Sequence, residues 1–167
     1  YNLKSDHTYY DITKKKTGEN MRKFHNWVAD TLVHNTCYIK KISGNIEHKM
    51  KILDYGCGVG GYLMKYYHAK IDMCVGFDLS HSGIYGNVDS ATIRYDKARK
   101  NKKYPDFPKC HFMVADGSLQ LNYNSQKNIK IINENKEKII NFFGKNKNEK
   151  VELFDTIVFS NTIHYMF

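Results

Sequence analysis

The chain has 167 residues, which is long enough for one domain with a hydrophobic core. Its 26 Lys and Arg residues outnumber 17 Asp and Glu, which gives a formal net charge of +9. This charge favours an anionic partner such as nucleic acid, and the alternative is a solvated, lysine-rich surface. No apolar run approaches the ~20 residues of a membrane span and no signal-peptide core is present, which argues against a membrane-spanning or exported protein.

The cysteines are scattered along the chain and form no C-x-x-C pair; they are Cys37, Cys57, Cys74 and Cys110. This spacing predicts neither a zinc site nor a disulfide framework, so we expect reduced thiols, no metal and an intracellular location.

The first element expected is a helix over residues 21–32, after a polar and aromatic stretch over residues 1–20. Apolar residues at helical spacing predict its buried face: Met21, Phe24, Val28, Thr31 and Leu32, joined by Trp27. His25 and Asn26 lie off the centre of this stripe. The sequence does not begin with Met, which suggests that it was taken from a longer polypeptide.

A glycine-rich turn organises the rest of the chain. Residues 51–53 predict the end of a buried strand, and residues 62–67 have helical character. Between them Gly56, Gly58 and Gly61 satisfy G-x-G-x-x-G, which alone is a weak signal and also fits a nicotinamide or flavin enzyme. A strand, a glycine turn and a helix with free amide groups predict a nucleotide-type site.

Two acids refine the type of ligand expected. The second strand, residues 73–77, ends at Asp78, which lies 22 residues after Gly56, close to the spacing of an acid that holds a ribose. Asp54 lies at the tip of the first strand, where a pyrophosphate is electrostatically unfavourable but the ammonium group of S-adenosylmethionine is favoured. The alternative is a purely structural turn in which Asp54 caps the following helix.

The remaining chain alternates helices and strands. Residues 79–87 predict a loop, 88–102 a basic helix, 111–115 a third strand that ends at Asp116, and 153–159 a fourth strand. The polar stretch 119–150 is interpreted as a surface insertion with one short helix at 134–143, terminated by Gly144. Alternation of this kind predicts an α/β fold with a parallel, doubly wound sheet. The polar residues expected at the carboxyl ends of its strands are Asp54, Asp78, Asp116, Ser160, His164 and Tyr165.

Three segments resemble the mRNA cap guanine-N7 methyltransferases, particularly those of large DNA viruses. Residues 22–27, R-K-F-H-N-W, resemble the family's R-N-F-(N/H)-N-W helix. Residues 53–61, L-D-Y-G-C-G-V-G-G, resemble L-D-L-G-C-G-K-G-G, and residues 160–167, S-N-T-I-H-Y-M-F, resemble Q-F-A-I-H-Y-S-F. The glycine segment is shared by S-adenosylmethionine enzymes at large, whereas the other two segments together are more specific.

The resemblance implies a role for each matching residue. The methionine part of S-adenosylmethionine would be held by Asp54, Gly56 and Gly58, and its ribose by Asp78. Other residues expected at the donor are Asp116, Gly117 and Ser118 at the adenine, with Ser160 and Tyr165 nearby. His25 and Asn26 would line the cap side. His164 and Tyr165 would stand between guanine and donor as the catalytic, positioning residues.

The implied activity is methyl transfer from S-adenosylmethionine to N7 of the guanosine cap, by proximity and in-line orientation without a general base. The implied fold is a Rossmann-like class I methyltransferase with strands in the order 3-2-1-4. Residues 1–45 would form the cap side and residues 46–167 the N-terminal part of the donor-binding domain, with further strands to follow. Residues 1–167 alone are therefore expected not to methylate caps.

The expected partners are the 5′ end of capped RNA and other capping-enzyme domains or subunits, with no membrane. The expected location is a cytoplasmic viral factory or virion for a viral protein, and the nucleus for a cellular one.

Two other functions remain open from the sequence. One is a nicotinamide-dependent oxidoreductase, but carboxylates at Asp54 and Asp116 make binding of a nicotinamide dinucleotide unfavourable. The other is an inactive methyltransferase-like module that supports a capping complex, favoured by departures from the family pattern at Ala29, Val59 and Ser160. The family more often carries Lys, Lys and Gln at these positions.

Overall fold

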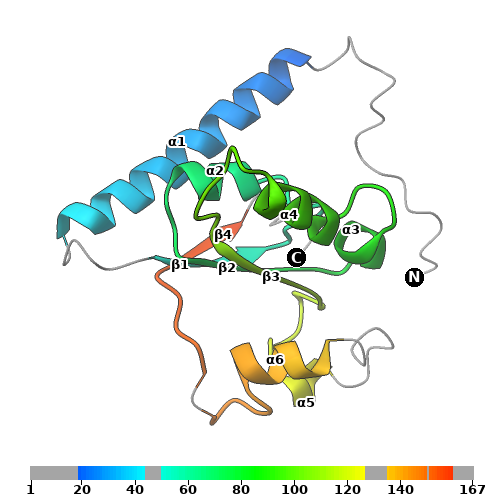
Figure 1. Cartoon of the computed structure of the whole chain (residues 1–167). Coiled ribbons are helices and arrows are strands. Elements are labelled where there is room, and N and C mark those ends of the chain that lie inside the picture. Colours follow the sequence, from blue (N-terminus) through cyan, green and yellow to red (C-terminus); the bar gives the residue numbers. More distant parts are fainter. Residues whose placement is uncertain (1–18, 44–49, 127–134, 150, 160–167) are drawn as a thin grey trace.

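The computed structural model describes residues 19–43, 50–126, 135–149 and 151–159. A four-stranded parallel sheet lies at its centre, with helices on both faces (Figure 1). The elements in chain order are α1 (Glu19–Ser43), β1 (Lys51–Tyr55), α2 (Leu63–His68), β2 (Met73–Asp78), α3 (His81–Tyr85), α4 (Ala91–Lys100), β3 (Lys109–Val114), α5 (Tyr123–Gln126), α6 (Lys136–Phe143) and β4 (Thr156–Phe159).

The strand order β3-β2-β1-β4 and the parallel pairing confirm the predicted α/β sheet. In β1, Ile52 is the register partner of Cys74 in β2 and of Thr156 in β4. The first five residues of β2 are all buried, as expected of a strand covered on both faces. The predicted strands therefore exist, with ends that differ by a few residues.

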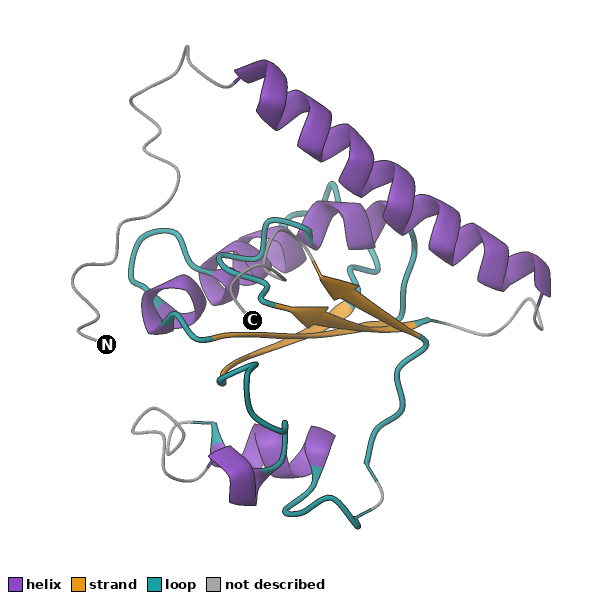
Figure 2. Cartoon of the chain, turned by 180° about the vertical axis from the view of Figure 1, so that it is seen from behind, coloured by secondary structure: helices purple, strands orange, loops and turns teal. Residues whose placement is uncertain are grey.

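Helices α1 to α4 cover one face of the sheet, and α5 and α6 lie against the other (Figures 1 and 2). On the first face Tyr66 and Ile84 belong to a core cluster that includes Ile52 of β1. On the second face Ile139 of α6, 1% exposed, packs in a cluster with Leu53 of β1. Each face of the sheet thus has its own apolar core.

The interpretation of residues 119–150 as a surface insertion is wrong for α6. Phe142 and Phe143 pack with Ile139 against the second core cluster. Polar contacts fix the same helix at the edge of β3, because the Lys138 ammonium donates to the Phe112 carbonyl at 2.6 Å.

The buried face predicted for the first helix is also wrong. Ala29, Val33 and Cys37, spaced four residues apart, form its buried stripe, whereas Phe24 and Trp27 are 56% and 63% exposed. Helix α1 is longer than expected, and toward its N-terminus it rises away from the sheet (Figure 1). The aromatic residues lie on that outer half, where no described element covers them.

Two short-range features differ from the expectation. The predicted loop over 79–87 contains α3, which begins after Ser80, whose hydroxyl accepts the Gly83 amide at 3.0 Å. Helix α4 is shorter than predicted because Ser90 caps it in the same way through the Ile93 amide. Serine at an N-cap supplies an acceptor for an otherwise unpaired amide.

Strand β4 forms one edge of the described sheet, and its outer residues Ile157 and Phe159 are 54% and 46% exposed. An apolar cavity of about 230 Å³ lies between this strand and α1, lined among others by Ala29, Tyr62 and Val158. All four cysteines are described and buried, and they form no disulfide. Within the described ranges no helix combines the length and apolar character needed to cross a membrane.

Candidate functional site

Three acids lie at the carboxyl edge of the sheet on neighbouring strands. The register pairs Asp54 of β1 with Gly76 of β2, two residues before Asp78. It pairs Asp78 with Val114 of β3, two residues before Asp116. The strands therefore bring the acids to one edge in a staggered row, as their positions in the sequence predicted.

Asp54 is almost completely enclosed, with 3% of its surface exposed. Burial raises the pKa of its carboxyl group to about 7; the nearby Tyr66 hydroxyl opposes this shift and the charge of Asp78 adds to it. The Tyr66 hydroxyl is itself buried and has no hydrogen-bond partner of good geometry in the described part of the chain. A cationic ligand group beside Asp54 would stabilise the charged carboxylate that burial disfavours.

Asp78 is held rigidly at the end of β2. One carboxylate oxygen accepts the Gly58 amide at 2.9 Å, and the other accepts the Ser80 amide at 2.8 Å. A carboxylate has about four acceptor positions, so each oxygen retains the capacity to accept a ligand hydroxyl. The predicted ribose acid is thus oriented by the backbone before any ligand binds.

The glycine turn leaves open space next to these acids. Gly58 has a φ of +52°, and a Cβ built on it would meet nothing within 4 Å. The turn is fixed to the sheet because the amides of Gly56 and Cys57 both donate to the Phe77 carbonyl, at 2.9 and 3.0 Å. Backbone at Gly58 is therefore accessible to a ligand, consistent with its predicted place in the binding site.

Asp116 starts a turn whose shape depends on Gln126, a residue that the sequence analysis missed. The Asp116 carboxylate accepts the amide and the hydroxyl of Ser118, at 2.8 and 2.7 Å. The side chain of Gln126, 0% exposed, accepts the Asp116 amide at 3.1 Å and donates to the Asp116 carbonyl at 2.8 Å. Gln126 also donates to the Gln120 carbonyl, so one amide group fixes both ends of the loop.

Tyr55 is a second residue that the sequence analysis missed. Its hydroxyl donates to the Gly117 carbonyl, and its ring packs edge-on against Phe77 with centroids 4.4 Å apart. A Cβ on Gly117 would lie 2.6 Å from the Tyr55 ring, so glycine is required there for close approach of the tyrosine. This contact supplies a structural reason for Gly117, beside the predicted contact with a ligand.

The predicted cap-side residues lie on α1, a different element from those that carry the acids. His25 and Asn26 are exposed on the outer half of α1, where the His25 ring lies 6.3 Å from that of Phe24. Their assignment stays a prediction, because among the described residues the His25 ring contacts only its neighbour Phe24 on the same helix. Ser160, His164 and Tyr165 lie outside the described residues.

The row of acids suits a polar organic ligand with hydroxyl and cationic groups. Among the described residues, no group of three His, Cys, Asp or Glu side chains is placed to hold a metal ion. Carboxylates at the ends of parallel strands beside a glycine turn are the arrangement of Rossmann-like, nucleotide-binding enzymes.

Within that class the chain belongs to the mRNA (guanine-N(7))-methyltransferase domain family, whose sequence model matches residues 1–133. This finding confirms the resemblance and the Rossmann-like prediction. The match includes the segments at 22–27 and 53–61 but not residues 160–167.

Two relatives carry names from the same family of activities. The chain is 31% identical over 167 residues to the "Probable mRNA-capping enzyme" of Acanthamoeba polyphaga mimivirus, covering 99% of this chain and 13% of that protein. It is 32% identical over 80 residues to an "mRNA cap guanine-N(7) methyltransferase" of Cryptococcus neoformans var. neoformans serotype D (strain JEC21), covering 48% of this chain and 11% of that protein. The chain thus spans a small part of the curated relatives that it matches.

A solved structure of the YcgJ protein from Bacillus subtilis is similar with a TM-score of 0.32 and 13% identity, over 51% of this chain and 31% of that one. This likeness is too weak to bear on the fold.

Proposed function

We propose that this chain forms part of an enzyme that transfers a methyl group from S-adenosylmethionine to N7 of the guanosine cap of mRNA. The observation that carries the proposal is the row of Asp54, Asp78 and Asp116 beside the open glycine turn, in a chain of the guanine-N7 methyltransferase family. Family membership favours methyl transfer over the nicotinamide-dependent alternative.

The residues present fit the chemistry of this donor. Asp54 is a nearly buried carboxylate suited to the ammonium end, and Asp78 keeps acceptor positions for two ribose hydroxyls. The turn from Asp116 to Ser118 is fixed by Gln126 and Tyr55 and would bind the adenine. When bound, S-adenosylmethionine supplies an electrophilic methyl group on a sulfonium, which becomes a neutral thioether.

The chain needs no general base for this reaction, because guanine N7 has an in-plane lone pair and carries no proton. As N7 forms its bond to carbon and the carbon–sulfur bond breaks, the positive charge moves to the guanine. The protein contributes by holding N7, carbon and sulfur in line, an effect that can remove roughly 7–11 kcal/mol of the barrier. The acids also make the edge of the sheet favourable for a cation.

We further propose that capped RNA is the acceptor and that this chain works within a larger capping polypeptide. Support for both comes from the mimivirus relative, which is named a probable mRNA-capping enzyme, and from the 13% of its length that the chain spans. We expect His25, Asn26, His164 and Tyr165 to contribute the guanine side of the site, and Ser160 to lie near the donor.

A methyl-transfer assay tests the proposal. The full-length protein is incubated with S-adenosylmethionine and the cap dinucleotide GpppA, and the product is fragmented in a mass spectrometer. We expect one added methyl group, on N7 of guanine. A methyl group on ribose or adenine contradicts the proposed reaction. Donor binding without turnover supports instead the inactive module, and binding of NAD in place of S-adenosylmethionine supports the oxidoreductase.

A further inference from the structure

Helix α4 and the loop after it carry much of the positive charge of the chain. Residues 91–109 contain seven Lys and Arg and two Asp, a net charge of +5 out of the +9 of the whole chain. Apart from Lys109 at the start of β3, five of the cations are exposed and form no salt bridge with any described residue: Lys97, Arg99, Lys100, Lys102 and Lys103. We call these five residues the basic tract.

Cations near the basic tract form salt bridges with acids, whereas the five residues of the tract do not. Arg94, on the same helix, donates two hydrogen bonds of 2.6 Å to the carboxylate of Asp89. Lys65 of α2 pairs with Asp30 of α1 at 3.3 Å. Uncompensated positive charge close together repels itself, and a bound polyanion relieves that repulsion.

The loop that carries Lys102 and Lys103 is held by aromatic packing. The Tyr104 ring lies 5.4 Å from that of Tyr67, and the Phe107 ring stacks on the same tyrosine at 5.3 Å. The Lys103 amide also donates to the Asn101 side chain at 3.0 Å. The loop therefore presents its lysines from a fixed backbone, which lowers the conformational entropy that a ligand must remove.

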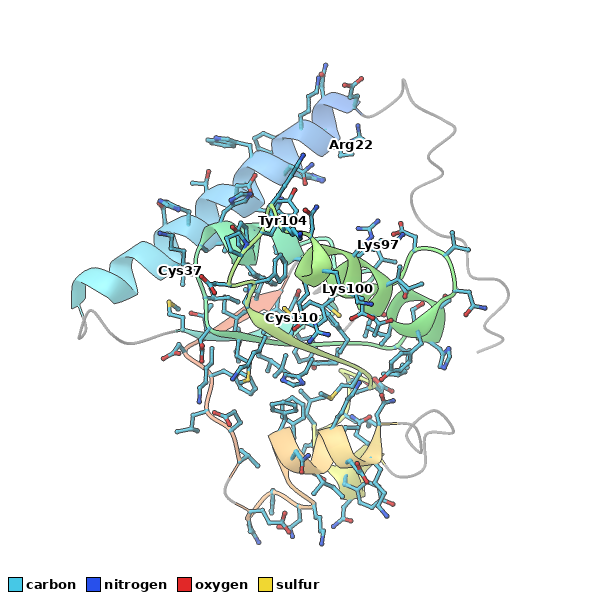
Figure 3. The ribbon with its side chains drawn as sticks, viewed as in Figure 1. Arg22, Cys37, Lys97, Lys100, Tyr104 and Cys110 are labelled. Carbon is cyan, nitrogen blue, oxygen red and sulfur yellow. The ribbon has the colours of Figure 1, made fainter. Side chains whose placement is uncertain are left out.

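The tract leads away from the candidate site. Helix α4 begins beside the glycine turn, since a Cβ on Gly60 would lie 3.3 Å from the Ala91 Cα atom. Its ten residues span about 15 Å, and the loop that follows enters β3, whose first residue Lys109 pairs with the first residue of β2. The helix thus runs from the carboxyl edge of the sheet toward its amino edge, and the tract begins at Lys97, roughly 9 Å along the helix from Ala91. Figure 3 shows Lys97 and Lys100 on α4 with Tyr104 near them, on the face that also carries α1.

We propose that the basic tract binds the phosphate backbone of the RNA that follows the cap. The inference rests on the proposed function, because the acceptor is taken to be a capped RNA whose cap lies at the carboxyl edge. Single-stranded nucleic acid is bound by positively charged surfaces that follow the backbone, with aromatic side chains nearby. Helix α4 leads from the site to the tract, so a chain of phosphates that leaves the site along this helix would reach the tract.

The test compares two acceptors in the full-length protein: a capped RNA of about twenty nucleotides and the dinucleotide GpppA, which has no RNA body. The variant Lys97→Ala/Lys100→Ala removes two charges from the tract. At about 0.1 M salt we expect the KM for capped RNA to rise roughly tenfold, while kcat and the KM for the dinucleotide stay within twofold. The salt dependence of RNA binding should become shallower by about 1.4 in the log–log slope, since each lost contact with a single strand contributes about 0.7.

Two matched variants separate charge from stability. Lys145→Ala/Lys147→Ala removes the same charge from exposed positions after α6, on the other side of the sheet, and should leave both KM values unchanged. Lys97→Arg/Lys100→Arg keeps the charge and should restore RNA binding. The proposal is overturned if the two alanine pairs raise the KM for capped RNA equally. It is also overturned if Lys97→Ala/Lys100→Ala raises the KM for the dinucleotide as much as the KM for capped RNA.

The outcome is distinguishable from failure of the proposed function. If the wild-type protein methylates neither acceptor, binding of an uncapped RNA of the same length still tests the tract. Affinity that falls with Lys97→Ala/Lys100→Ala but not with the control pair supports an RNA surface. If no variant changes the affinity for RNA, the proposal is overturned. The basic tract would then bind an acidic protein partner or only be solvated.

Discussion

Asp78 combines a structural role with the predicted role at the ribose, because its two oxygens already accept the amides of Gly58 and Ser80. The residue therefore couples the position of the glycine turn to the end of β2. A ligand hydroxyl would meet a carboxylate that has lost most of its rotational freedom, which favours binding.

Asp78→Ala should abolish measurable binding of S-adenosylmethionine, because each charge-assisted hydrogen bond contributes roughly 1.5–3 kcal/mol. Isothermal titration measures the affinity, and circular dichroism checks that the sheet persists. Asp96→Asn, which removes an exposed carboxylate of α4, serves as the matched control and should bind normally. Unchanged affinity in Asp78→Ala would refute the ribose assignment.

Asp54 should make stability depend on pH. Its pKa is about 7 in the folded protein and near 3.8 when unfolded, so below about pH 4 the carboxyl is neutral in both states and burial costs little. As pH rises toward 7, the Asp54 carboxyl loses its proton readily only in the unfolded protein. The free energy of unfolding therefore falls by up to about 4 kcal/mol.

Asp54→Asn removes this cost, so its advantage in Tm over the wild-type protein should grow from pH 4 to pH 8 while donor affinity falls. Thermal melts across that range measure the first effect and calorimetry the second. A constant Tm difference at all pH values would show that Asp54 does not carry a raised pKa.

Gln126 illustrates a residue whose role depends on contacts that are distant in sequence. Gln126→Ala should leave the amide and carbonyl of Asp116 without partners and destabilise the fold by roughly 1–3 kcal/mol. If the loop serves the adenine, affinity for adenosine should fall along with affinity for the whole donor. Hydrogen exchange at residues 116–118 should rise in this variant, and unchanged protection there would contradict the role.

At the scale of whole elements, the sequence predicted the strands far better than the helix faces. A parallel strand covered on both sides is a continuous apolar run, so residues 73–77 stand out. The mostly apolar residues 153–159 also indicated a strand, although β4 is only Thr156–Phe159 and is partly exposed at the edge of the described sheet. The buried face of α1 was predicted wrongly because its large aromatic residues suggested burial. The residues that are buried, Ala29, Val33 and Cys37, are smaller and allow α1 to pack closely on α2.

Helix α6 was judged to be surface because lysine and asparagine dominate its surroundings. Its contribution to the core comes from only a few apolar side chains, of which Ile139 is the most buried. Ile139→Ala should therefore lower the free energy of unfolding by about 2–5 kcal/mol. Urea titration measures the loss, and Asn141→Ala, at an exposed position of the same helix, should change it little. Similar stability of the two variants would show that α6 is not part of the core.

At the scale of the whole molecule, the positions of the three acids followed from strand order alone. Once the sheet is parallel, residues that end successive strands must lie at one edge, so Asp54, Asp78 and Asp116 could be grouped from the sequence. Tyr55 and Gln126 could not, because their hydrogen bonds to the loop after β3 depend on the packing of side chains far apart in the chain.

The same architecture separates three surfaces: the row of acids at the carboxyl edge, the basic tract along one face, and the apolar edge strand β4 beside α1. The apolar cavity under α1 also bears on Ala29, where the resemblance led us to expect lysine. Because Ala29 lines that cavity and is buried, a lysine there must lose solvation or displace the helix.

The central claim is that the three acids form one methyl-donor site, and a crystal structure of the full-length protein with S-adenosylhomocysteine tests it most directly. We predict the amino-acid end of the ligand beside Asp54, both ribose hydroxyls on Asp78, and the adenine against the loop from Asp116 to Ser118. A ligand found in the cavity between α1 and β4, or a ribose that does not touch Asp78, would contradict the claim.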